Sequence, residues 1–511
     1  MKSNIARLNK FETGFYFFTW TFGIFYGIYQ LYLAGSYFKE YEDPFNDFTT
    51  GWSWIGKNRD VSDIEWSLWI PFTHRIIPWI IVHFLISQLL KSYKQSSTVI
   101  CSWYILISMI FLWNYAGWIC MIIMLTQPCI ACLLTSFRSK KIAYIIHFAT
   151  LGVLQLTSVL DIVLRNWLTL ENDIYHMLIV AICWIQLRNI SCSIDNINDY
   201  KHNNIIGFFK NFIQSTAYCL YLPTLFIGPF FLYSDFIKGI NQRFKKWTLK
   251  RIIFFIINLA RYTFWLYFTE FSMHFIYCNA FQYHPDEVAK LNSWAFYGMG
   301  YCMGQYFHNK YVVFYGLYGE IGRGDNIDVP LTPKCIGRIH LYSEMWKYFD
   351  RGLYQFLTRY IYIPILSLNL PLNKLLASFM SFGFVFIWHG VDRFIFTWSL
   401  MNFLGLSLEG FIKTIGKTDK YIEIESKFSS INIRRFHCLI ASPLLALSAI
   451  SNFYFFAGQE IGNIYLYRLF HDSPQIIGTL LFFLYCCCQV STEVKLYEKK
   501  NKIDMNLLKK I

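Results

Sequence analysis

Charged residues are scarce in this chain. Only 15% of its 511 residues are Asp, Glu, Lys or Arg, whereas soluble domains carry roughly 25%. Hydrophobic residues make up 55% and aromatic residues 20%. Such a deficit of charge is expected where most of the protein surface faces lipid, and it argues against a soluble globular protein. We therefore predict an all-α polytopic membrane protein with about ten transmembrane helices plus re-entrant helices.

The sequence also lacks internal repeats, low-complexity segments and an evident cleavable signal peptide. Its fourteen cysteines are scattered, many of them inside apolar runs, so they do not suggest a disulfide framework. Apolar runs of suitable length predict membrane-spanning helices. They lie at residues 14–34, 75–93, 98–114, 116–135, 143–165, 174–190, 251–280, 293–317, 372–390, 393–412, 434–456 and 473–490.

The charges that are present predict the topology. Basic residues precede the first span (Lys2, Arg7, Lys10) and crowd the C-terminal tail (Lys495, Lys499, Lys500, Lys502, Lys509, Lys510), whereas acidic residues follow the first span (Glu40, Glu42, Asp43, Asp47). Positive charge marks the cytosolic side, so both termini should be cytosolic and the loop after the first span lumenal. The aromatic residues of 38–66 predict a helix lying at the membrane interface there.

The net charge of +14 does not predict nucleic-acid binding. The basic residues cluster in short segments between spans, as in 138–141 and 238–251. This pattern is typical of topology signals and of attraction to anionic lipids. The alternative is that part of this positive field attracts an anionic cytosolic ligand such as a coenzyme A nucleotide.

His389 is the most informative single residue. It ends an apolar stretch that begins near Leu372, and an ionisable side chain at that depth usually faces a protein interior or a water-filled cavity. An imidazole can take or give a proton near neutral pH. The alternative is a histidine that only makes hydrogen bonds between helices. Upstream, the Gly- and Pro-containing region 318–350 argues against a continuous span, and the amphipathic segment 345–364 predicts a helix buried within protein at membrane depth.

The segment Met345–Pro364, followed by Trp388-His389-Gly390, resembles the membrane-bound O-acyltransferase (MBOAT) family. Members transfer a fatty acyl group from acyl-CoA to an acceptor. The resemblance implies that His389 is the catalytic residue and that Asp350 is its upstream acidic partner. From the residues alone, Asp350 could instead form a salt bridge with Arg351 or Arg359.

Within the family, the chain most resembles the members that attach palmitate to the N-terminal cysteine of Hedgehog proteins. Four stretches carry this resemblance: Asp63-Ile64-Glu65-Trp66, Leu187-Arg188-Asn189-Ile190-Ser191, Gly228-Pro229 with Phe236, and Pro333-Lys334-Cys335 leading to Trp388-His389-Gly390. Relatives of the glycerol-uptake type share parts of Met345–Pro364, so this segment alone does not choose between branches. Gly390 and the Pro-Lys-Cys motif favour the Hedgehog branch.

The resemblance implies further roles. Cys335 would ligate the iron of a haem b, Trp346 and Asn402 would lie near the reaction chamber, and Arg188 and Lys246 would contact coenzyme A. Palmitoyl-CoA would be the acyl donor and a secreted Hedgehog-type protein the acceptor, in the endoplasmic reticulum membrane or the Golgi. We also expect a monomer surrounded by membrane lipids, with one transmembrane domain over residues 1–511, a first span and lumenal segment at 1–66 and a catalytic segment at 320–412.

Two other functions remain open at this point. One is an acyltransferase of the glycerol-uptake type, or one with a lipid or small-molecule acceptor. The other is a transporter, which broken helices and an intramembrane histidine also suit.

Overall fold

A computed structural model describes residues 6–39, 43, 46–157, 161–198, 205–368 and 370–508. Lys2, Glu40, Glu42, Lys509 and Lys510, on which part of the topology prediction rests, lie outside these residues. The described chain is almost entirely helical, which confirms the predicted fold class.

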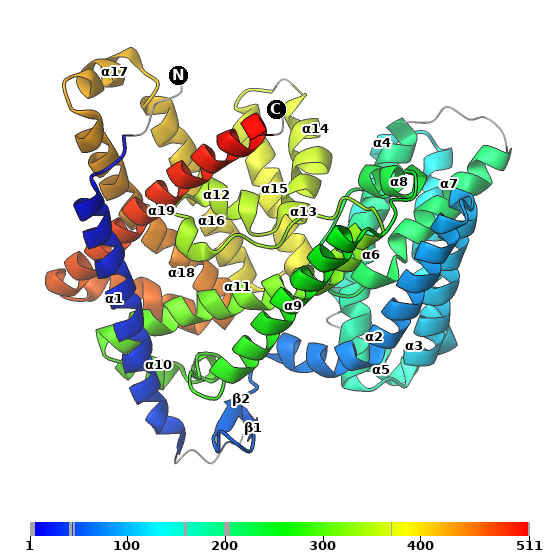
Figure 1. The fold of residues 1–511 in the computed structure, drawn as a ribbon, viewed down its shortest axis with the longest axis horizontal. Coiled ribbons are helices and arrows are strands. Elements are labelled where there is room, and N and C mark those ends of the chain that lie inside the picture. Colours follow the sequence, from blue (N-terminus) through cyan, green and yellow to red (C-terminus); the bar gives the residue numbers. More distant parts are fainter. Residues whose placement is uncertain are drawn as a thin grey trace.

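The elements follow one another along the chain and are drawn in Figure 1. The α-helices are α1 (Lys10–Ala34), α2 (Ile64–Ser92), α3 (Ser97–Ser136), α4 (Lys140–Thr157), α5 (Asp161–Leu168), α6 (Asn172–Asn198), α7 (Ile205–Cys219), α8 (Tyr233–Asn241), α9 (Leu249–Ser272), α10 (Pro285–Lys290), α11 (Ser293–Gly324), α12 (Tyr342–Tyr348), α13 (Arg351–Phe356), α14 (Ile363–Leu366), α15 (Asn373–His389), α16 (Arg393–Ile415), α17 (Asp419–Ser426), α18 (Ser430–His471) and α19 (Pro474–Leu508). Short 3-10 turns are η1 (Gly35–Lys39), η2 (Leu222–Thr224), η3 (Ala280–Tyr283) and η4 (Ile336–Arg338), and η5 (Leu357–Tyr362) is a π-helix.

Within the described residues, seven helices are long and apolar enough to cross a membrane, namely α2, α3, α6, α9, α16, α18 and α19. Two of them are kinked. Gly117 in α3 (φ 86°) and Gly458 in α18 (φ 80°) adopt positive φ angles that glycine reaches without steric cost. The non-helical backbone at Gly117 divides α3 into two helical parts, which match the predicted spans 98–114 and 116–135.

The two sides of the protein differ in Figure 1. Helix α1 begins and α19 ends on the same side, whereas the strands β1 (Phe48–Thr50) and β2 (Asn58–Asp60) lie at the opposite end. This arrangement agrees with the prediction that both termini share one side. By that prediction, the strand end is lumenal.

The strands themselves correct the prediction of an interfacial helix across 38–66. They pair antiparallel, with Phe48 opposite Asp60. The buried carboxylate of Asp60 accepts the backbone N–H groups of Asn279 (3.1 Å) and Ala280 (3.0 Å), which tie the hairpin to the connection between α9 and α11. Aromatic residues are also favourable in strands, and these long-range bonds hold the segment as a hairpin.

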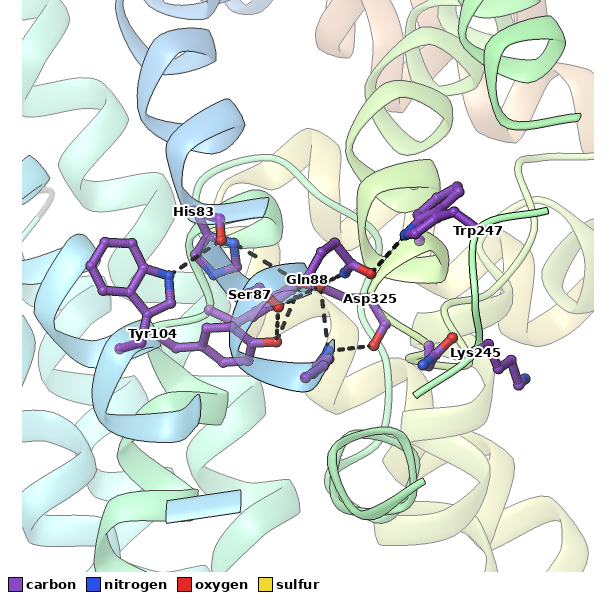
Figure 2. A network of polar contacts seen from close by, with 12 residues as sticks. His83, Ser87, Gln88, Tyr104, Lys245, Trp247 and Asp325 are labelled. Atoms are coloured by element: carbon purple, nitrogen blue, oxygen red, sulfur yellow. Dashed lines mark hydrogen bonds and ion pairs between the residues drawn. The ribbon is translucent and has the colours of Figure 1, made fainter. Parts of the chain in front are cut away.

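A buried polar network holds together the C-terminal ends of α2 and α11 and the N-terminal part of α3 (Figure 2). Asp325, which follows α11 and is 0% exposed, accepts hydrogen bonds from Ser87 (2.7 Å), Gln88 (2.6 Å) and Tyr221 (2.8 Å). The ammonium of Lys91 lies 3.4 Å from the same carboxylate and donates to the Asp325 carbonyl at 2.7 Å. A buried charge persists only when it is paired and hydrogen-bonded, so this network pins the C-terminal end of α11.

Two further differences from the sequence predictions concern the region around the site. Helix α11 continues to Gly324 instead of ending near residue 317, because its last turns pack inside the protein. The segment 345–364 is not one helix. It forms α12, α13, the π-helix η5 and α14 in succession, and such breaks are tolerated where protein covers the freed backbone groups.

Candidate active site

A cavity of about 510 Å³ opens between α1, α11, α12, α15, α16, α18 and α19. Four of the predicted site residues line it: His389, Asp350, Trp346 and Asn402. The structure therefore brings together side chains that are up to 56 positions apart in the sequence. The rest of the wall is mainly aromatic and aliphatic, as a cavity for a fatty acyl chain requires.

His389 is the last residue of α15. The helix ends there because Gly390 takes φ 129°, a conformation that residues with a side chain rarely adopt. Rings of Trp398 and Phe455 surround the imidazole, with centroids at 5.3 and 5.1 Å. The residue is exposed, and it lines the cavity wall, so its accessible surface includes the surface toward the cavity.

Among the described residues, no protein group hydrogen-bonds to the His389 ring. Both nitrogens are therefore available to a substrate. A neutral imidazole with a free lone pair can accept a proton from an attacking nucleophile.

Asp350 is fixed by neutral donors. It caps the N-terminus of α13, accepting the Leu353 N–H at 2.8 Å, and it accepts the Tyr315 hydroxyl at 2.7 Å. The salt bridge considered for Asp350 is not what the structure shows, because Arg359 pairs with Asp195 at 2.9 Å instead. The carboxylate is consequently held in place while it faces the cavity.

Trp346 and Asn402 are joined directly. The indole Nε1–H of Trp346 donates to Oδ1 of Asn402 at 3.0 Å, and Nδ2 of Asn402 donates to the Trp398 carbonyl at 2.8 Å. The two residues therefore fix the relative positions of α12 and α16 beside the cavity. The ring of Trp398, which lies against His389, is oriented by another bond, because its Nε1–H donates to Oδ1 of Asn452 at 3.2 Å.

A second cavity of about 340 Å³ meets the first at His389. Its wall is more polar and includes Asp63, Glu65 and Lys310. His389 lines both cavities, together with the rings of Phe455 and other aromatic residues. A group bound in either cavity would reach the same imidazole.

Cys335 lies just outside the large cavity. It is half-buried at the start of η4, and the two residues that follow it, Ile336 and Gly337, form part of the cavity wall. A haem held by one thiolate needs a single cysteine beside an apolar wall, and this arrangement fits that requirement. Lys334 and Arg338 flank the thiol, and both form ion pairs with Glu498.

Arg188 is buried inside the protein, so its position does not support the predicted contact with coenzyme A. It is 0% exposed, and its guanidinium donates to the carbonyls of Tyr218 (3.3 Å) and Cys219 (3.1 Å) and to the hydroxyl of Thr224 (2.7 Å). The break between α7 and α8 frees these carbonyls, and the arginine satisfies them. Lys246 is exposed in the loop between α8 and α9 and is not part of either cavity wall.

The sequence analysis missed several residues of the site. Tyr315, Trp398 and Phe455 contact Asp350 or His389, but they come from α11, α16 and α18. The spacing of Tyr311 and Tyr315 places both on one face of α11. That pattern is equally typical of core packing, so by itself it does not identify either tyrosine as a site residue.

Comparisons with known proteins identify the family of the chain. The model of the family described as "MBOAT, membrane-bound O-acyltransferase family" matches residues 133–421, more than half of the chain. The chain is 28% identical to the protein-cysteine N-palmitoyltransferase Rasp of Drosophila melanogaster, over 92% of this chain and 94% of that protein. It is 25% identical to the protein-cysteine N-palmitoyltransferase HHAT of Mus musculus, over 91% and 94%. It is also 25% identical to the membrane-bound O-acyltransferase GUP2 of Saccharomyces cerevisiae, over 58% and 47%. The chain therefore belongs to the membrane-bound O-acyltransferase family.

Proposed function

We propose that this acyltransferase moves a palmitoyl group from palmitoyl-CoA to the N-terminal cysteine of a secreted Hedgehog-type protein. Membership of the family supports acyl transfer in a membrane, and the names of the relatives that align over nearly their whole length support palmitate and a protein cysteine. The observation that carries the proposal is the position of His389, which lines both cavities. One cavity suits an acyl chain and the other a polar acceptor.

The chemistry follows from this position. The nucleophile of the acceptor attacks the thioester carbonyl carbon, its bond to the acyl group forms, and the bond to the coenzyme A sulfur breaks. His389 accepts the proton that the nucleophile loses and returns it to the departing thiolate. Asp350, fixed by Tyr315, lies in the same cavity and orients the reacting groups.

The large cavity is suited to the acyl chain of a fatty acyl donor. Its wall includes Ile24, Leu445, Ala449 and Leu480, among many apolar side chains. Burial of each methylene of the acyl chain contributes about 0.8 kcal/mol, so a long chain gains considerable binding energy there.

A cluster of cations beside this cavity is suited to the phosphates of coenzyme A. The charged ends of Lys334, Lys347 and Arg351 lie 5.3, 5.4 and 5.6 Å from the ring centre of Tyr348. Lys334 is neutralised by Glu498, but Lys347 and Arg351 have no carboxylate partner among the described residues. We assign the coenzyme A contact to these two residues in place of Arg188. Because they would hold only the nucleotide, Lys347→Gln and Arg351→Gln should each raise KM for palmitoyl-CoA without raising KM for the acceptor peptide.

We also propose that Cys335 would hold the iron of a haem b through its thiolate, with Ile336 and Gly337 in the cavity wall beside it. The haem would supply a rigid apolar plate and redox-active iron at this wall. We place the protein in the endoplasmic reticulum membrane, with residues 320–412 as the catalytic segment of a single domain over residues 1–511.

The test is a transfer assay with labelled palmitoyl-CoA. Purified protein is offered a Cys-initiated Hedgehog-type peptide and a lysophospholipid in parallel, and wild type is compared with His389→Ala. We expect label on the peptide with wild type and at most background with the variant. His471→Ala is a matched control, because that histidine is exposed near the end of α18 and should be dispensable. Preferential labelling of the lysophospholipid would instead assign the lipid acceptor that the GUP2 similarity allows.

A further inference from the structure

The connection from α8 into α9 concentrates positive charge. We call residues 242–250 the basic loop, because they contain four basic residues and no acidic one, namely Arg243, Lys245, Lys246 and Lys250. All four are exposed, and none of them forms an ion pair with a carboxylate among the described residues. By contrast, Lys238 on the neighbouring α8 pairs with Asp235 at 3.7 Å. Cations that the protein does not neutralise itself attract an anionic ligand.

The basic loop is held in place by bonds to two other helices. Arg251, in the first turn of α9, donates to the carbonyl of Lys245 and, at 2.8 Å, to that of Gly324. Its guanidinium lies 3.9 Å from the ring centre of Trp247. Figure 2 shows Trp247 at the edge of the network around Asp325, where its Nε1–H donates to Gln88 at 3.0 Å. A loop fixed in this way loses little conformational freedom when a ligand binds.

The helix that follows the basic loop faces lipid. Helix α9 is long and apolar enough to cross a membrane, and only 11% of its apolar window is buried inside the protein. In Figure 1 it runs from α8 toward the β-hairpin, so the basic loop lies at the opposite end, which is the predicted cytosolic side. The lipid-facing surface of α9 therefore meets the charged loop where lipid headgroups begin.

Exposed apolar side chains lie next to these cations. Leu249 precedes Lys250 and is 73% exposed, and Tyr93, which follows the α2 helix that binds Trp247, is 72% exposed. A cationic surface that also presents apolar groups fits an amphiphile with a phosphate and acyl chains. The basic loop contributes to neither cavity wall, which argues against a soluble nucleotide bound for acyl transfer. Cytosolic leaflets contain anionic phospholipids.

We propose that the basic loop binds the headgroup phosphate of an anionic phospholipid in the cytosolic leaflet. Lys245 and Lys246 contact the phosphate, and Leu249 contacts the acyl chains. The lipid contributes no atom to the acyl-transfer reaction, so this site is independent of the proposed function. Through Trp247 and Gln88, its binding supports the buried network that holds α2 and α11 together.

The test measures lipid binding by native mass spectrometry of the full chain in a neutral detergent. Phosphatidylserine and phosphatidylcholine are added at equal concentrations. A lysine at an anionic lipid surface contributes about a fivefold gain in affinity, so wild type should bind phosphatidylserine about tenfold or more tightly than phosphatidylcholine. The double variant Lys245→Gln with Lys246→Gln should weaken phosphatidylserine binding about 25-fold. Its binding of phosphatidylcholine should match that of wild type.

A second double variant separates this site from a general effect of charge. Lys417→Gln with Lys420→Gln removes two exposed lysines at the start of α17 (Asp419–Ser426), so the net charge changes by the same amount. None of the four substituted lysines forms an ion pair among the described residues, so the unfolding temperature without lipid should match wild type in both double variants. Lys417→Gln with Lys420→Gln should also keep the wild-type affinity for phosphatidylserine.

Two soluble competitors identify the source of the phosphate. Glycerophosphoserine has the headgroup without acyl chains, and coenzyme A is the soluble nucleotide. Neither should displace phosphatidylserine when added at the same concentration. Displacement by glycerophosphoserine would make this a site for free phosphates, and displacement by coenzyme A would make it a nucleotide site. Either result overturns the inference, as does equal binding of the two lipids by wild type or an equal loss of binding in the two double variants.

Discussion

Replacing Tyr315 with phenylalanine tests how the site holds its carboxylate. The change keeps the ring on α11 and removes one hydroxyl, which donates to Asp350 at 2.7 Å. A hydrogen bond to a charged group contributes about 1.5–3 kcal/mol. If Asp350 must stay fixed in the transition state, this loss appears in the activation barrier. At 1.36 kcal/mol per tenfold change, kcat/KM should fall by roughly ten- to 150-fold.

The same helix provides a control. Tyr318→Phe removes a buried hydroxyl that bonds to Thr73 at 3.2 Å and does not line either cavity. Labelled palmitoyl transfer to the peptide and thermal unfolding in detergent are measured for both variants. We expect a large loss of rate only for Tyr315→Phe, with similar unfolding temperatures. Activity of Tyr315→Phe within twofold of wild type, or equal losses in both variants, would refute the role given to the Tyr315–Asp350 bond.

Three further predictions concern stability, pH and haem. Asp325→Asn leaves the buried Lys91 ammonium without its counter-charge, so the free energy of unfolding should fall by about 3–5 kcal/mol, measured by chemical denaturation in detergent. Burial raises the pKa of Asp60 to about 7, although the backbone N–H groups that it accepts favour ionisation. Its protonated form stabilises the hairpin fully below the unfolded pKa near 3.8, and this contribution is lost as pH rises through 7. The hydrogen-exchange protection factors of residues 48–60, which are corrected for the intrinsic rise of exchange with pH, should therefore be lower at pH 8 than at pH 6, and Asp60→Asn should abolish the difference. The purified protein should show a Soret band that disappears in Cys335→Ala and persists in Cys487→Ala, which removes a thiol from the wall of the large cavity. Loss only in the second variant would move the ligand to Cys487.

The parts of the site that could be predicted from the sequence are those with local motifs. His389 and Asp350 lie in recognisable segments, and Trp346 and Asn402 follow from the same resemblance. Tyr315 could not be predicted, because its bond to Asp350 depends on how α11 packs against α13. The same holds for Lys310, whose partners come from α2, more than 240 residues earlier in the chain.

The fold shows the same division between local and long-range causes. Apolar runs located most helices, since lipid burial is set by composition over about twenty residues. The ends of these helices depend on contacts with residues distant in the sequence, as the end of α11 depends on the hydrogen bond between Asp325 and Ser87. Arg188 carries the same charge as a surface arginine, and only the carbonyls freed by the break after α7 explain why it is buried.

The rings of Trp398 and Phe455 lie against His389, and an acyl chain bound in the large cavity would displace water from the part of the ring that stays open. A base that can activate an amine could also activate water, which would waste the activated fatty acid by hydrolysis. With water displaced from His389, productive turnover would depend on the arrival of the acceptor. An enzyme of this kind can hold a loaded donor in reserve until a newly made secretory protein presents its terminus.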